Sequence, residues 1–229
     1  MMFELFTKLF KKKIKYHEIS KFLKPNDLFF DIGAHIGDKS KELIKNNIKV
    51  VMVEPQPFCL DQLNKLYSEN PLVNIVPMGL GRSIQKMEMS INSETPVIST
   101  FAEHWKLGRF SNSKWDKKIT VDITTLDELI KKFGNPKYIK IDVEGFEHEV
   151  MLGLTKKSGI ISFEFTSEFI HDAHNSIDHL ISLGYLDFNY SLGERKKFST
   201  KWSNSEKIKE KINENIKKDN LLWGDLYCK

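Results

Sequence analysis

Short apolar runs alternate along this chain with segments whose apolar residues recur at helical spacing. The runs typical of strands fall at 28–32, 50–53, 73–77, 138–142 and 160–165. Between the second and third runs, Pro57 suits a first helical turn, and the apolar positions that follow are four apart or fewer, at Leu60, Leu63, Leu66 and Tyr67. This alternation predicts an α/β fold, a doubly wound and mostly parallel sheet with helices on both faces.

Three later segments extend this pattern. Thr125 and Glu128 are spaced as in a capping box and predict a helix that Gly134 ends. The charged segment 205–218 predicts a surface helix with a narrow apolar seam. The apolar segment 221–227 predicts an antiparallel strand at the C-terminal edge of the sheet.

The length of 229 residues suits one sizeable core. We expect an N-terminal amphipathic helical segment at 1–24 and a single Rossmann-like domain at 25–229, with an insertion at about 82–120 where the strand-helix alternation breaks. The aromatic and cationic residues of this insertion have two interpretations, stacking on an acceptor or packing beneath a long loop. They are Trp105, Arg109, Phe110 and Trp115.

Charge and cysteine content narrow the class of protein. Lys+Arg 35 against Asp+Glu 31 gives a net charge of +4, with both signs interspersed, so we expect no nucleic-acid partner. Cys59 and Cys228 lack metal-type spacing, which argues against a zinc site or a disulfide framework and favours a cytoplasmic location.

Residues 1–15 combine apolar positions with a lysine run. The segment is too short and too charged to span a bilayer, and its basic residues do not precede the apolar stretch as they do in a signal peptide. A basic amphipathic helix can dock peripherally on a membrane. The favoured interpretation is a helix that packs on the domain or on a second subunit, as in a homodimer.

The most informative motif is an apolar strand that runs into a turn bracketed by Gly33 and Gly37. Glycine permits a sharp bend and a close approach of ligand to backbone. Asp31 beside the turn disfavours a phosphate and suits a ligand that carries an ammonium and a sulfonium. Asp31 also occupies the place of the first glycine of a G-x-G-x-x-G fingerprint, which disfavours a nicotinamide cofactor.

Glu54 closes the next apolar run, about 20 residues after Gly33, where an acid at the second strand end can accept the hydroxyls of a ribose. The order of strand, D-x-G-A-x-x-G, helix, strand and acid predicts an S-adenosylmethionine site.

A second acidic centre follows the fourth strand run. Asp142 and Glu144 lie at the carboxyl end of that strand, where open α/β sheets bind ligands. Glu164, inside an apolar strand, requires a cation, a hydrogen-bond donor or an open cleft. These three acids are the candidate catalytic bases, ahead of His35, His148, His171 and His174. A divalent cation bridging Asp142 and Glu164 stays open as an alternative, and no metal ligand is assigned.

The order of these motifs resembles the FkbM-family methyltransferases. The resemblance rests on 31–37, 53–55, 125–129, a later Glu164 and, most specifically, the run I-K-I-D-V-E-G-F-E at 139–147. It implies a class I Rossmann-like O-methyltransferase that uses S-adenosylmethionine on a hydroxyl of a sugar, glycan or other natural product. It further implies that Asp142 and Glu144 lie near the transfer centre, and that the cofactor contacts Asp31, Gly33, Ala34, His35, Gly37, Glu54, Pro55, Met78 and Gly79.

We therefore expect an acceptor that enters over the carboxyl ends of the strands and is covered by residues 90–120. Two alternatives stay open. One is a non-catalytic Rossmann-like binding or scaffold protein, against which the acids at both strand ends argue. The other is an RNA methyltransferase, for which the sequence has no Asn-Pro-Pro-Tyr-like motif and no basic stripe.

Overall fold

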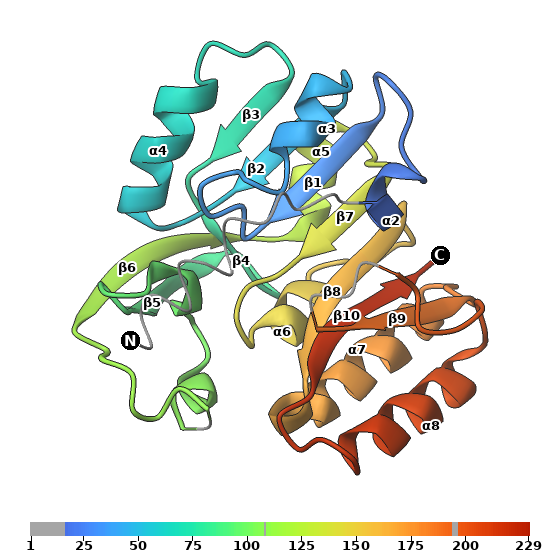
Figure 1. Cartoon of the computed structure of the whole chain (residues 1–229). Helices are drawn as coiled ribbons and strands as arrows, with labels where there is room; N and C mark the ends of the chain where they lie inside the picture. Colours follow the sequence, from blue (N-terminus) through green and yellow to red (C-terminus); the bar gives the residue numbers. More distant parts are fainter. Residues whose placement is uncertain (1–16, 108, 194–196) are drawn as a thin grey trace.

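A seven-stranded sheet in the order β3-β2-β1-β7-β8-β10-β9 forms the centre of the computed structural model, which describes residues 17–107, 109–193 and 197–229 (Figure 1). Its strands are β1 (Leu28–Ile32), β2 (Lys49–Val53), β3 (Val73–Val76), β7 (Tyr138–Ile141), β8 (Ile160–Thr166), β9 (Phe188–Leu192) and β10 (Trp223–Cys228). Strands β3, β2, β1, β7 and β8 run parallel. The five predicted strand runs and the mostly parallel α/β sheet are confirmed.

Strand β10 is antiparallel, as predicted, but its predicted position at the sheet edge is wrong. It pairs with β8 on one side and with β9 on the other, so β9 is the edge strand. The chain passes from β8 to β9 and leaves a gap one strand wide, which β10 fills on its return. The sequence analysis missed β9, a run of five residues in which the apolar Phe188, Tyr190 and Leu192 alternate with the buried polar residues Asn189 and Ser191.

Helices cover both faces of the sheet, because successive residues of a strand point to opposite sides. Phe29 of β1 packs in a cluster with Leu43 and Leu63, whereas Phe30 packs in the larger cluster with Leu126 and Ile177. The first face carries α2 (His17–Ser20), α3 (Lys41–Lys45) and α4 (Pro57–Tyr67). The second carries α5 (Leu126–Phe133), α6 (Glu147–Met151), α7 (Ile170–Ser182) and α8 (Ser205–Ile216).

The helix boundaries follow local signals in the sequence. Pro57 is at the first turn of α4, as predicted. The Thr125 hydroxyl accepts a hydrogen bond from the Glu128 amide at 3.2 Å and caps α5, which ends at Gly134 with φ of 95°. Helix α8 confirms the helix predicted over 205–218, and its apolar seam faces the core.

A second, three-stranded sheet contains β4 (Gly79–Leu80), β6 (Lys117–Thr124) and β5 (Gln85–Ile91), in that order. Residues 82–120 thus supply β5, two short helices, η1 (Pro96–Ile98) and η2 (Glu103–Lys106), and the start of β6. Trp105 in η2 is 3% exposed and packs against Phe110, with ring centroids 5.2 Å apart. Of the two interpretations of this aromatic cluster, the structure therefore favours packing.

An ion pair ties the segment after η2 to the end of β8. Arg109 donates two hydrogen bonds of 2.6 Å to Glu168, which lies in η3 (Ser167–Phe169). This pair fixes the segment beside the carboxyl end of β8.

The N-terminal amphipathic segment falls mostly on residues 1–16, outside the described residues, so its membrane or subunit contact stays a prediction. Within 17–107, 109–193 and 197–229, no helix has the length and apolar character needed to cross a bilayer.

Candidate functional site

Asp31 lies fully buried near the end of β1, directly opposite Lys140 of β7. Its Oδ2 accepts a hydrogen bond of 2.6 Å from Ser40, and its Oδ1 is 3.6 Å from the Lys140 ammonium. Within the described part of the chain, Oδ1 has no hydrogen-bond partner. A buried carboxylate oxygen without a partner is costly, so Oδ1 is a candidate acceptor for an N–H donor of a ligand.

The glycines of the turn after β1 are required by packing within the fold. Gly33 and Gly37 have φ of 76° and 80°. A Cβ at Gly33 would lie 1.9 Å from the carbonyl oxygen of Asp142, and one at Gly37 would lie 2.9 Å from the Tyr67 ring. The turn therefore sits directly against the end of β7 and against α4.

The backbone amides of this turn are largely committed inside the protein. The amides of Gly33 and Ala34 donate to the carbonyl of Val53 at 3.0 and 3.1 Å, and the Gly37 amide donates to Ala34 at 2.8 Å. A ligand here must rely on side chains more than on these amides, unlike a phosphate in a glycine-rich loop.

Glu54, 3% exposed at the end of β2, is held by two backbone donors. His35 N donates to Oε2 at 2.8 Å and Gln56 N donates to Oε1 at 2.9 Å, so the carboxylate links both strand ends. Burial raises the pKa of Glu54 to about 7, although these hydrogen bonds act to lower it. Each oxygen retains a lone pair that can accept a ligand hydroxyl.

The remaining predicted cofactor residues differ in their placement. Pro55 is half-buried beside Glu54, and Met78 is half-buried after β3. Gly79 is buried in β4, where an added Cβ would lie 2.6 Å from Ile123 and 2.8 Å from Phe101. Gly79 is thus enclosed by protein, and its lack of a side chain serves packing.

The three predicted catalytic acids come together. Carboxylate oxygens of Asp142, Glu144 and Glu164 all lie within 4.8 Å of one another. Within the described part of the chain, no histidine joins this group. His148 instead approaches Ser176 of α7 at 3.1 Å. Of the other three candidate histidines, His171 and His174 are residues of α7, and His35 lies in the turn after β1.

Two lysines that the sequence analysis missed neutralise Asp142. Lys140 is 3.0 Å from Oδ2, and Lys39 makes a second contact with the same oxygen. Burial alone would raise the pKa of Asp142, but the two ammonium groups hold it well below its usual range. A signal for Lys140 existed, since a lysine in an apolar strand requires a partner by the argument applied to Glu164.

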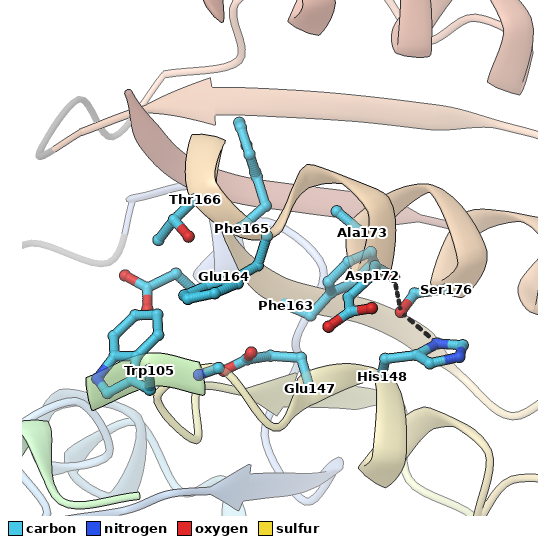
Figure 2. A pocket seen from close by; sticks show the side chains of 12 residues that line it. Trp105, Glu147, His148, Phe163, Glu164, Phe165, Thr166, Asp172, Ala173 and Ser176 are labelled. Carbon is cyan, nitrogen blue, oxygen red and sulfur yellow. Dashed lines mark hydrogen bonds between the residues drawn. The ribbon is translucent and has the colours of Figure 1, made fainter. Parts of the chain in front are cut away.

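Glu144 and Glu164 lack such compensation. Burial, reinforced by the negative charge of Asp142, raises the pKa of both well above the usual range. Within the described residues, Glu164 makes no ion pair or hydrogen bond, and it lines a hollow (Figure 2). The sequence analysis required a cation, a hydrogen-bond donor or an open cleft for Glu164, and the structure places Glu164 at an open cleft.

The turn that carries Glu144 is strained and braced. Glu144 has φ of 57°, which is rare for a residue with a Cβ, and the Thr100 hydroxyl donates to its carbonyl at 2.6 Å. Glu147 Oε1 accepts from the amides of Val143 and Gly145 at 2.9 and 3.3 Å. The motif therefore contains a bracing acid, Glu147, for which the sequence analysis gave no role.

The acidic group is a poor cage for a divalent cation. Calcium takes six to eight oxygens and magnesium needs near-octahedral geometry. Asp142 already contacts two ammonium groups, which leaves Glu144 and Glu164 as the uncompensated acids. A divalent cation at these three acids therefore stays an open alternative, and no metal ligand is assigned.

Comparisons with known proteins agree with this architecture. The family model described as "Methyltransferase FkbM domain" matches residues 31–192. The hexuronic acid methyltransferase AglP of Haloferax volcanii is 25% identical over 140 residues, which cover 60% of this chain and 54% of that protein. The chain thus spans about half the length of this curated relative.

A crystal structure of methyltransferase FkbM from Methylobacillus flagellatus is similar with a TM-score of 0.55 and 15% identity. The match covers 90% of this chain and 44% of that one. At this identity the likeness shows the fold alone, and it agrees with the predicted class I methyltransferase topology.

Proposed function

The chain belongs to the FkbM methyltransferase family, and on that premise we propose that it is an S-adenosylmethionine-dependent O-methyltransferase. Its acceptor in this proposal is a hydroxyl of a sugar, glycan or other natural product. The observation that carries the proposal is the pairing of a cofactor-type acid, Asp31, with a group of acids one strand away that includes the uncompensated Glu164.

The residues at the first two strand ends fit this cofactor. Asp31 Oδ1 is buried, lies 3.6 Å from the Lys140 ammonium and has no hydrogen-bond partner among the described residues, so it suits the cofactor's ammonium group. Glu54 suits the ribose hydroxyls, because its oxygens lie beside the turn and keep acceptor capacity. When bound, the cofactor supplies an electrophilic methyl group on a sulfonium.

Glu164 is the side chain best suited to take the proton of the acceptor hydroxyl. An efficient general base has a pKa near the working pH, and the two lysines make Asp142 a weak base. Glu164 has a raised pKa and faces a hollow. We assign Glu164 as the base and Asp142 as a positioning residue that fixes Lys39 and Lys140.

Calorimetric titration with S-adenosylmethionine and with its demethylated product tests the cofactor assignment. We expect micromolar binding of both ligands, and its loss in Asp31→Ala and Glu54→Ala. Asp122→Ala is the control, since Asp122 lies exposed on β6 and pairs with Lys86. If neither ligand binds the unaltered protein, the proposed function is wrong.

We also propose a cytoplasmic location. Cys59 and Cys228 are both buried and unpaired, as is usual for proteins of reducing compartments.

A further inference from the structure

We propose that the acceptor carries a protonated amine, as an amino sugar does, and no carboxylate. This inference rests on the proposed function and names the substrate class of the same site. It starts from the hollow that Glu164 lines between η2 and α7 (Figure 2).

This inner hollow has a volume of about 20 Å³, and a second, outer hollow beside it has a volume of about 330 Å³. The two share Gly145, His148 and Asp172 among their lining residues, so they lie side by side, and we call the pair the groove. The inner end of the groove holds Glu164, and its outer part runs past α6 toward β5. The outer hollow is in the size range of small-ligand sites, whereas the inner one has room for a single small group of a ligand.

The charged side chains that line the groove are acidic. Among the described residues that line it, none is lysine or arginine. The two acids that line the outer hollow alone form ion pairs with residues that do not line the groove. Glu149 pairs with Arg82 and Glu103 pairs with Lys106, each at 2.5 Å. Within 17–107, 109–193 and 197–229, the inner acids Glu164, Glu147 and Asp172 have no such partner, apart from the His104 ring 3.8 Å from Asp172.

Two buried polar atoms point to a ligand independently of these acids. Thr166 Oγ1 and Trp105 Nε1 have no hydrogen-bond partner among the described residues, and their residues are 4% and 3% exposed. Both line the inner hollow together with Glu164, and Thr166 shares its face of β8 (Figure 2). Buried polar atoms are normally satisfied, so one small polar group of a ligand, such as a hydroxyl, fits beside them.

A protonated amine explains the remaining charge. It would pair with Asp172 and leave Glu164 free to act as the base, whereas a carboxylate would add negative charge beside Glu164, Glu147 and Asp172. The hexuronic acid in the name of the Haloferax relative is therefore not the acceptor expected for this groove.

The test uses three probes with the same ring, methyl glucosaminide, methyl glucoside and methyl glucuronide. Each is titrated calorimetrically into the full chain with and without the demethylated cofactor, in EDTA and again in magnesium. We expect the glucosaminide to bind at least about tenfold more tightly than the glucuronide, in EDTA as well as in magnesium. Asp172→Asn should remove most of this preference. The control Asp178→Asn, which changes an acid of the same helix that pairs with Lys209 outside the groove, should keep it.

Equal or tighter binding of the glucuronide would overturn the inference, as would the absence of binding by all three probes. A preference that requires magnesium would also overturn it, because a metal would then occupy the acidic group. Cofactor binding is read separately in the same titrations. If the demethylated cofactor binds and the glucuronide is preferred, this inference fails and the proposed function stands; if the cofactor does not bind, the proposed function fails.

Discussion

Replacing Gly33 with alanine perturbs the closest approach in the proposed cofactor site. The new Cβ would lie 1.9 Å from the Asp142 carbonyl oxygen and 2.9 Å from its carbonyl carbon, and both are backbone atoms that no side-chain rotation can move. Carbon–oxygen contacts in proteins are about 3.3 Å or longer, so the ends of β1 and β7 would have to separate by more than about 1 Å. That movement strains the hydrogen bond of 3.0 Å from the Asp142 amide to Ile32.

The expected loss of unfolding free energy combines two contributions. A φ of 76° costs alanine about 1–2 kcal/mol relative to glycine. The backbone displacement adds about 2 kcal/mol or more, for a total of about 3–5 kcal/mol. Gly184→Ala is the matched control, because Gly184 has φ of 93° but nothing within 4 Å of an added Cβ, so only the first contribution applies.

Urea unfolding of the two variants and the unaltered protein measures this difference. Gly33→Ala should also lose affinity for the demethylated cofactor at low temperature, where the variant is still folded, while Gly184→Ala should retain it. Equal destabilisation by the two substitutions would refute the close packing of the turn on β7.

Three further outcomes are expected. Burial raises the pKa of Glu54 from 4.5 to about 7, so the folded protein binds the Glu54 proton more tightly than the unfolded chain does. Protonation of Glu54 therefore adds to the unfolding free energy fully below pH 4.5, and this gain is lost as the pH rises through 7. Urea unfolding should therefore show the unaltered protein losing up to about 3 kcal/mol relative to Glu54→Gln between pH 4.5 and 8, and a parallel pH dependence would contradict this. Thr125→Ala should lower the unfolding free energy by about 1 kcal/mol through loss of the α5 cap, with Thr125→Ser close to the unaltered protein. Asp142→Asn should keep cofactor affinity in calorimetry but lose methyl transfer, and normal turnover would make Asp142 a structural partner of the lysines.

Much of the fold was predictable because its signals are local. The apolar runs of β1, β2, β7 and β8 each stand out within a few residues, and Thr125 marks the start of α5 by its own side chain. Strand β9 was missed although its residues alternate, with Phe188, Tyr190 and Leu192 on one apolar face; the run is only five residues long, and its other face is polar yet buried. Its position beside β10 depends on pairings between distant segments, which no local pattern encodes.

The sequence predicted which residues form the site better than it predicted their charge states. Asp142 was identified from its place after a strand, but its state depends on Lys39, which is more than a hundred positions away in the chain. The roles of Gly33 and Gly37 could likewise be predicted only in part. Their conformational freedom can be inferred from sequence, whereas the atoms that press on them, Asp142 O and the Tyr67 ring, come from elsewhere in the fold.

Strand register is what turns these separate signals into one site. The β1–β7 pairing places Asp31 opposite Lys140, and the β7–β8 pairing of Ile141 with Phe163 brings the next residues, Asp142 and Glu164, to the same level. Since side chains alternate between faces, a slip of one residue would turn Glu164 into the opposite core and away from Asp142. The apolar neighbours of these acids, which are buried on the other face, therefore hold the reacting groups in place. Core packing thus fixes the separation between the cofactor acid on β1 and the base on β8.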